Sequence, residues 1–190
     1  MPDTTSAQFF EAKYADASDP WAFASSPYEQ YRYERTFQAL AHQHYQWAFE
    51  PGCSIGILTQ KLATLCEGID ALDISSTAVS QAKTRCSTLR QVSVRCASLQ
   101  DAMPLKAPDL LVLSEIGYYF EPDAWKQKVE QLVALCLKPA TLIATHWLGH
   151  SPDHLISGDR VHTLIQSIPG LVLTYSERHG GFRLDRWHIE

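Results

Sequence analysis

Three segments carry residue types that suit the binding of a nucleotide-containing cofactor. The first, FEPGCSIG, has Glu50 at the end of an expected strand, Gly52 in the following turn and Gly56 at the start of a helix. Backbone N–H groups at such a helix start favour an anionic or carboxylate-bearing ligand. A dinucleotide fingerprint requires G-x-G-x-x-G, whereas this turn reads G-C-S-I-G, which argues against NAD.

Two carboxylates follow at positions that suit the same ligand. Asp73 stands 17 residues beyond Gly56, next to Ile74, at the end of the second expected strand, where a carboxylate accepts hydrogen bonds from both ribose hydroxyls. Asp101, in the loop after the third strand, is placed to accept a hydrogen bond from an adenine amine. Taken singly, each has a simpler interpretation, because Asp73 also suits a helix cap and Asp101 a solvated loop.

A parallel sheet is needed to bring these segments together. Between about residues 44 and 174, β-rich runs alternate with helical periodicity. This alternation predicts an α/β, Rossmann-like fold with a seven-stranded mainly parallel sheet, helices on both faces and a C-terminal antiparallel hairpin. The expected strands are about 45–50, 69–74, 91–96, 109–114, 141–147, 171–177 and 181–189. Helices are expected between them, including 122–136 and 159–167.

We expect one domain, 1–190, in which residues 1–42 form a helical segment that covers the pocket and residues 43–190 form the α/β core. Ser26-Pro27-Tyr28-Glu29 predicts a capping box that begins a helix ending near Ala41. Residues 6–15 predict another short helix.

Taken together, these motifs resemble class I S-adenosylmethionine-dependent methyltransferases, in which E-x-G-x-x-x-G, an acidic residue after strand two and an Asp after strand three line the cofactor. Within that superfamily, DPWAFASSPYEQYRYERTFQAL and DLLVLSEIGYYFEP are similar to the NodS-type group. The resemblance covers about residues 9–145 well and the C-terminal third poorly. It implies S-adenosyl-L-methionine as cofactor and roles in binding it for Glu50, Gly52, Gly56, Asp73, Ile74 and Asp101.

The resemblance also implies that Trp21 and Arg32 close over the cofactor, with Arg32 suited to pair with its carboxylate. Ser54 departs from the glycine that most class I enzymes have at that position, and a small residue still fits there.

A methyl acceptor is expected beyond the fourth and fifth strands. Tyr118 and Tyr119 are candidate substrate contacts, and Glu115 or His146 is the candidate proton acceptor. The alternatives are a packed aromatic turn with an exposed carboxylate and a structural histidine. Asp159 is a helix N-cap or a contact for a sugar hydroxyl or ammonium.

A metal site is not expected. His146, His150 and His154 have i, i+4, i+8 spacing, but Gly149 and Pro152 interrupt any helix between them and no Cys pattern accompanies them.

Composition and charge limit the classes of partner that the protein is expected to bind. The charge of −5 and the pI of about 5.9 come without a basic stripe, so a nucleic-acid partner is not expected. The longest apolar runs are far shorter than a membrane span, and the N-terminal residues lack a secretory pattern. The five cysteines contain no C-x-x-C pair and are interpreted as thiols. A soluble cytoplasmic protein is therefore expected.

The sequence thus predicts a methyltransferase acting on a small molecule, and the NodS resemblance implies N-methylation of an amino sugar or related amine. An O-methyltransferase of another metabolite and a cofactor-binding module without turnover remain open. The oligomeric state is also open.

Overall fold

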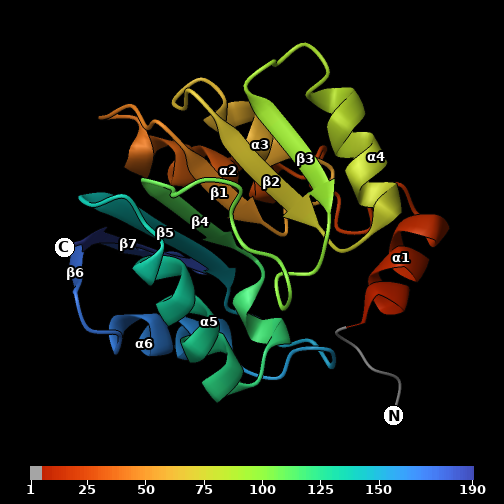
Figure 1. Cartoon of the computed structure of the whole chain (residues 1–190). Coiled ribbons are helices and arrows are strands. Elements are labelled where there is room, and N and C mark those ends of the chain that lie inside the picture. The colour runs from red at the N-terminus through yellow and green to blue at the C-terminus, as the bar shows by residue number, and fades with distance from the viewer. Residues whose placement is uncertain (1–5) are drawn as a thin grey trace.

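The computed structural model describes residues 6–190 and contains one seven-stranded sheet in the order β3-β2-β1-β4-β5-β7-β6 (Figure 1). The strands are β1 (Ala48–Pro51), β2 (Ile69–Asp73), β3 (Val92–Cys96), β4 (Leu110–Ser114), β5 (Ala140–Trp147), β6 (Leu171–Arg178) and β7 (Phe182–Ile189). The first five are parallel, and β7 pairs antiparallel with both β5 and β6. The prediction of a mainly parallel α/β sheet with a C-terminal hairpin is confirmed.

Helices cover both faces of the sheet. They are α1 (Ala7–Asp16), α2 (Pro27–Leu40), α3 (Ile57–Leu62), α4 (Ser76–Arg85), α5 (Pro122–Ala134) and α6 (Gly158–Gln166), with a short 3-10 turn, η1, at Gly117–Tyr119. Side chains of α2, α3 and α4 share one buried cluster with the sheet, and side chains of α5 and α6 share the other. Figure 1 shows α5 and α6 in front of the sheet and α1 at its side, beside α4.

Strand residues alternate between the two clusters. Ala48, Leu110 and Val112 belong to the cluster of α2, α3 and α4, whereas Phe49 and Leu111 belong to the cluster of α5 and α6. Because successive strand side chains point to opposite faces, a strand buried on both faces reads as a continuous apolar run. This burial explains why LLVL in β4 lacks the usual polar alternation.

Two predicted helix starts need correction. Ser26 precedes α2 as expected, but its side chain makes no cap hydrogen bond and Glu29 pairs with Arg32 instead of closing a capping box. The N-cap of α6 is Ser157, whose hydroxyl accepts from the backbone N–H of Arg160, so the prediction that Asp159 caps this helix is wrong.

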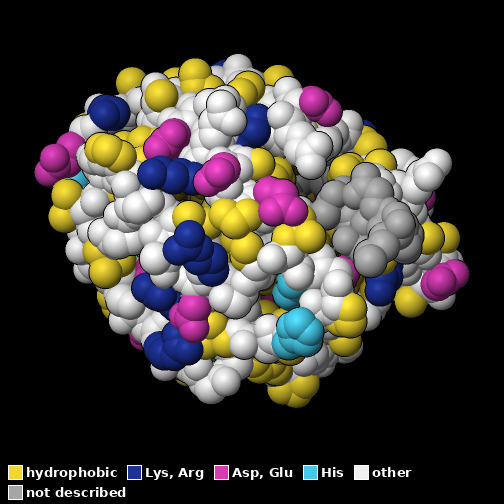
Figure 2. All heavy atoms as spheres, turned by 90° about the horizontal axis from the view of Figure 1, so that it is seen from below, with side chains coloured by type: hydrophobic (Ala, Val, Ile, Leu, Met, Phe, Trp, Pro, Cys, Tyr) yellow, Lys and Arg dark blue, Asp and Glu magenta, His cyan; other side chains and the backbone are white. Residues whose placement is uncertain are grey.

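The end of the molecule seen from below has mixed charges (Figure 2). Basic and acidic side chains intermingle toward the left, which is the side of β6 and β7 in Figure 1. Arg178 pairs with Asp159 in that region, and Arg35 pairs with Glu177. None of the helices in residues 6–190 is long and apolar enough to cross a membrane.

Candidate functional site

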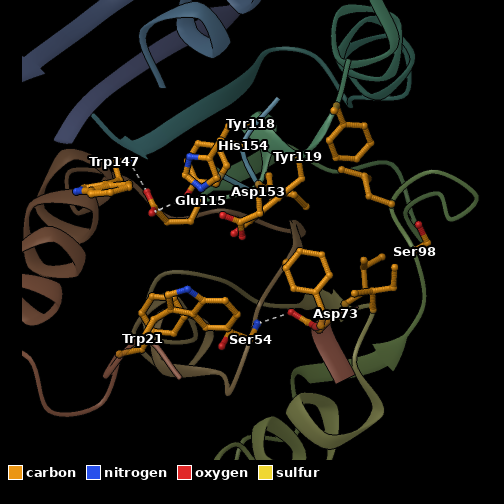
Figure 3. A pocket seen from close by; sticks show the side chains of 18 of the residues that line it. Trp21, Ser54, Asp73, Ser98, Glu115, Tyr118, Tyr119, Trp147, Asp153 and His154 are labelled. Atoms are coloured by element: carbon orange, nitrogen blue, oxygen red, sulfur yellow. Dashed lines mark hydrogen bonds between the residues drawn. The ribbon is translucent and has the colours of Figure 1, made fainter. Parts of the chain in front are cut away.

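A cavity of about 480 Å³ opens at the carboxyl ends of the parallel strands. Its wall combines the turns after β1 to β4, the end of β5 and the chain from α1 to the start of α2. Seven residues that the sequence nominated line it: Trp21, Gly52, Asp73, Ile74, Glu115, Tyr118 and Tyr119. Figure 3 shows Asp73 and Ser54 on one side of the cavity and Glu115, Tyr118 and His154 on the other.

The turn after β1 needs glycine at two places for different reasons. Gly52 has φ +75° and lines the cavity, and a Cβ added there would lie 3.1 Å from Ile116 Cδ1. Gly56 has φ +79°, and its added Cβ would lie 3.1 Å from the Cα of Ala82 in α4. The close approach at Gly56 is therefore between helices, and Gly56 does not line the cavity.

Asp73 ties this turn to the start of α4. Its Oδ2 accepts from the backbone N–H of Ser54 at 2.9 Å, and its Oδ1 accepts from that of Ser75 at 2.9 Å. Burial raises the pKa of Asp73, although the backbone N–H donors act in the opposite direction. Each carboxylate oxygen keeps a second lone pair, so Asp73 can still accept hydrogen bonds from a ligand.

Glu50 lies behind the cavity wall instead of within it. Its side chain is buried, and its Oε2 has no hydrogen-bond partner among residues 6–190. Burial raises the pKa of Glu50 to about 8. The buried Thr59 hydroxyl acts in the opposite direction and lowers the pKa of Glu50.

Helix α1 closes the cavity on the side of Asp73 and Ser54. Tyr14 is almost fully buried, and its hydroxyl is hydrogen-bonded to the Ser54 hydroxyl. Glu11 accepts hydrogen bonds from Ser75 and Thr77 at the start of α4, which lower the pKa of Glu11 to about 2. These contacts link the N-terminal segment to the end of β2. They join residues that lie far apart in the sequence, so local sequence patterns do not predict them.

Glu115 begins the opposite wall in a backbone conformation that non-glycine residues rarely adopt, with φ +57°. Its Oε1 accepts from the backbone N–H of Trp147 at 2.7 Å, and its Oε2 accepts from the Tyr118 hydroxyl at 2.6 Å. Burial raises the pKa of Glu115, and the nearby Arg32 opposes this. Strained residues concentrate at functional sites, which supports a role for this turn.

The prediction that His146 faces the cavity is wrong, because its side chain is fully buried and does not line the wall. Its Nε2 accepts from the backbone N–H of Gly117 at 3.0 Å, so the ring proton is on Nδ1. Nδ1 lies 3.2 Å from His162 Nε2, and His162 Nδ1 lies 2.8 Å from Asp185 Oδ2. His146 therefore holds the turn that carries Tyr118, through a buried chain ending at Asp185.

Tyr118 contributes an aromatic ring to the wall opposite Asp73. Its ring stacks on that of His154, with centroids 3.7 Å apart and planes at 14° (Figure 3). Asp153 adds a carboxylate to the same wall, next to Ser151. Within residues 6–190, no group of three His, Cys, Asp or Glu side chains is arranged to hold a metal ion.

Arg32, Asp101 and Asp159 were also nominated and do not line the cavity. Arg32 is fully buried and pairs with Glu29 and Glu115 behind the cavity wall. Asp101 is exposed, just beyond the cavity-lining segment Ser98–Gln100. Asp159 forms ion pairs on the outside of α6.

Sequence reasoning missed several lining residues: Phe10, Tyr14, Phe23, Tyr28, Glu29, Ser98, Leu99, Gln100, Asp153 and His154. One indication of these residues was present in the sequence, namely the high number of aromatic side chains in α1 and the short segment that follows it. Glu29 carried none, because its pattern also fits a helix cap.

The family model for nodulation protein S (NodS) matches residues 4–168. Nodulation protein S of Sinorhizobium fredii is 27% identical over 121 residues, which are 63% of this chain and 56% of that protein. Its counterpart from Bradyrhizobium diazoefficiens is 28% identical over 138 residues, which are 72% of this chain and 66% of that protein. The chain thus spans less than two thirds of the length of each of these relatives.

The fold is similar to the crystal structure of N-methyltransferase NodS from Bradyrhizobium japonicum WM9 in complex with S-adenosyl-l-homocysteine. The TM-score is 0.85 and the sequence identity 20%, with 98% of each chain covered. At this identity the likeness establishes the shared fold.

Proposed function

The chain belongs to the NodS family, and from that premise we propose that it is an S-adenosylmethionine-dependent N-methyltransferase whose acceptor is a small-molecule amine of the amino-sugar class. The observation that carries the proposal is the single cavity into which the turns after β1, β2 and β4 converge. Asp73 and Glu115, distant in sequence, face the same space across it (Figure 3).

The residues present fit such a cofactor. A cavity of about 480 Å³ falls within the range of small-molecule sites. Gly52 leaves bare backbone at the turn, and Asp73 has lone pairs available for ribose hydroxyls. Glu50 offers an unpartnered buried oxygen directly behind the turn. Ile74 and the segment Ser98–Gln100 supply the adjoining wall, beside Asp101.

When bound, the cofactor would supply a methyl group on a positively charged sulfur; the S–CH3 bond would break as the neutral acceptor nitrogen forms the N–CH3 bond, with S-adenosylhomocysteine as the leaving group. The protein's contribution is then mainly to hold the acceptor at attack distance in a site from which water is excluded. Tyr14, Trp21 and Phe10 form an apolar cover for this purpose. Glu115 is the candidate proton acceptor on the far wall, because it lines the cavity and burial raises the pKa of its carboxyl, which makes the carboxylate a stronger base.

Calorimetric titration with S-adenosylhomocysteine tests the cofactor site. We expect micromolar binding by the wild type and a loss of about 10- to 100-fold in Asp73→Asn, the cost of one charged hydrogen-bond acceptor. Asp123→Asn, an exposed aspartate at the start of α5, is the matched control and should bind as the wild type does. Thermal melting of both variants separates a binding defect from unfolding, because Asp73 also accepts two backbone hydrogen bonds.

Absence of binding by a folded wild-type protein contradicts the proposal. Incubation with labelled cofactor and a panel of amines, amino sugars and phenols then tests turnover. Product formation that depends on an amine distinguishes the enzyme from a cofactor-binding module, and product from phenols alone indicates an O-methyltransferase.

A further inference from the structure

A buried arginine lies between two glutamates on the acceptor side of the cavity. Arg32 of α2 has a fully buried side chain, and its Nε donates to Glu29 Oε2 at 3.0 Å. Its Nη1 lies 2.8 Å from Glu115 Oε1. This contact is an ion pair but not a hydrogen bond, because the N–H of Arg32 is not directed at the oxygen. Burial lowers the pKa of Arg32, but Glu115 and Glu29 raise it more, so Arg32 remains charged. The three side chains together keep one formal negative charge.

The hydrogen-bonding capacity of the two glutamates is unequal. Both oxygens of Glu115 already have donors, from Trp147 and Tyr118, in addition to the Arg32 ion pair. Only Oε2 of Glu29 contacts Arg32, and Oε1 has no hydrogen-bond partner within residues 6–190. Glu29 lines the cavity with a side chain that is 13% exposed. Within residues 6–190, Glu29 Oε1 is therefore one of two carboxylate oxygens on this wall without a donor, the other being Asp153 Oδ2, and it is the one whose carboxylate Arg32 holds in place.

The charge of the whole wall has one sign. Among the described lining residues, four are carboxylates (Glu29, Asp73, Glu115 and Asp153) and none is a lysine or arginine. The charge of Arg32, behind the wall, is shared by two of them. The cavity wall stays negative overall even when a methyl donor with a net charge of plus one is bound. The wall therefore favours a positively charged methyl acceptor over an anionic one.

We propose that Glu29 is the acceptor-recognition residue, whose free Oε1 receives the ammonium group of the amine, and that the Arg32–Glu115 pair holds Glu29 in position for this. The bound ammonium then gives one proton to a carboxylate of this wall, so that the nitrogen has a lone pair for the attack. The inference rests on the proposed methyl transfer and deepens it, because it explains why nitrogen is selected over oxygen. A neutral hydroxyl acceptor of the same shape makes no charged hydrogen bond with Glu29, and such bonds are about twice as strong as neutral ones. The ring of Tyr118, stacked on His154, offers an apolar platform nearby for the rest of the acceptor.

The test compares wild type, Glu29→Gln and Glu29→Asp with fully deacetylated chitobiose as the amine probe and its N-acetylated form as the hydroxyl-only probe. We expect methylation of the amine probe only. Glu29→Gln should raise KM for it about 10-fold or more, the effect of losing one charged hydrogen bond, with a smaller change in kcat. Glu29→Asp keeps the charge opposite Arg32, so it remains informative if the Gln variant does not fold, and its KM should lie between the other two.

Glu34→Gln, on the exposed face of the same helix, is the matched control and should leave KM unchanged. Affinity for S-adenosylhomocysteine should stay within about twofold of wild type in Glu29→Gln, since Glu29 lies on the acceptor side. An unchanged KM for the amine overturns the inference. So does a parallel loss of S-adenosylhomocysteine affinity, which would assign Glu29 to the cofactor. A wild type that binds S-adenosylhomocysteine but methylates no amine refutes the proposed acceptor class itself.

Discussion

The buried chain from Gly117 through His146 and His162 to Asp185 makes a prediction about stability and pH. Because the Nε2 of His146 accepts from a backbone N–H, protonating that nitrogen would place two N–H groups against each other. Burial, with His162 and Arg32 adding to it, lowers the pKa of His146 well below its ordinary value. In the folded protein His146 is therefore neutral, whereas in the unfolded chain it takes up a proton below about pH 6.5.

Proton linkage gives the direction in which the free energy of unfolding changes with pH. Below about pH 6.5 the unfolded chain binds a proton that the folded protein does not, so the free energy of unfolding falls as the pH falls. The slope approaches about 1.4 kcal/mol per pH unit for one histidine, which amounts to about 1.4 kcal/mol between about pH 7.5 and about pH 5.5. Glu50 acts in the opposite direction, because its pKa is raised to about 8, and so only a comparison of variants isolates the histidine.

The variant is His146→Gln, whose side-chain oxygen can still accept from Gly117 but cannot become charged. At about pH 7.5 we expect a loss of about 1–3 kcal/mol, because His162 Nε2 loses its buried donor. By about pH 5.5 the gap should shrink by about 1.4 kcal/mol, since only the wild type loses the histidine contribution. Urea unfolding followed by tryptophan fluorescence at several pH values measures both quantities.

His188→Gln is the control, because His188 is exposed on β7, and its curve should run parallel to that of the wild type. If the gap between wild type and His146→Gln is the same at both pH values, His146 is not held neutral by the fold. The proposed direction of the hydrogen-bond chain would then be wrong.

Two further substitutions test the supports of the cofactor side. Gly56→Ala should destabilise the protein by about 1–3 kcal/mol, because it combines a left-handed backbone with a close contact to Ala82 of α4, and differential scanning calorimetry should show a lower Tm. Arg95 donates two hydrogen bonds to the fully buried carboxylate of Asp70, so Arg95→Leu should lower the free energy of unfolding in urea by about 3–5 kcal/mol. A loss under about 1 kcal/mol would show that the remaining hydrogen bond, from the backbone N–H of Leu105, suffices for Asp70.

Local patterns predicted the strands and the glycine-containing turn after β1. The apolar runs of β2 and β4 fall within one or two residues of their predicted bounds, because burial on both faces leaves a continuous signal. Gly52 was found from its place after a strand, and Asp73 from the next strand end. These features depend on neighbouring residues and on one rule of parallel sheets, that carboxyl ends share an edge.

Contacts between distant segments could not be read in this way. His146, His162 and Asp185 are separated by 16 and 23 residues, and nothing in the spacing indicates that β5, α6 and β7 bring them into one line. His146 was nominated because its strand ends at the cavity, but alternation places its side chain in the core instead. Asp101 missed the wall by one residue, since the loop turns outward after Gln100.

Arg32 was predicted to pair with the carboxylate of a cofactor, and the structure pairs it with Glu29 and Glu115 instead. A guanidinium suits the carboxylate of a cofactor, but a buried one that is already paired has little capacity left for a third anion. Removing both glutamates would leave the fully buried guanidinium of Arg32 unpaired, at a cost of about 3–5 kcal/mol. The stable arrangement is the one in which Arg32 fixes both carboxylates, so that its charge organises the acceptor wall without entering the cavity. The i, i+3 pair of Glu29 and Arg32 on α2 therefore does more than stabilise the helix. Because Arg32 also pairs with Glu115, it connects α2 to the turn after β4.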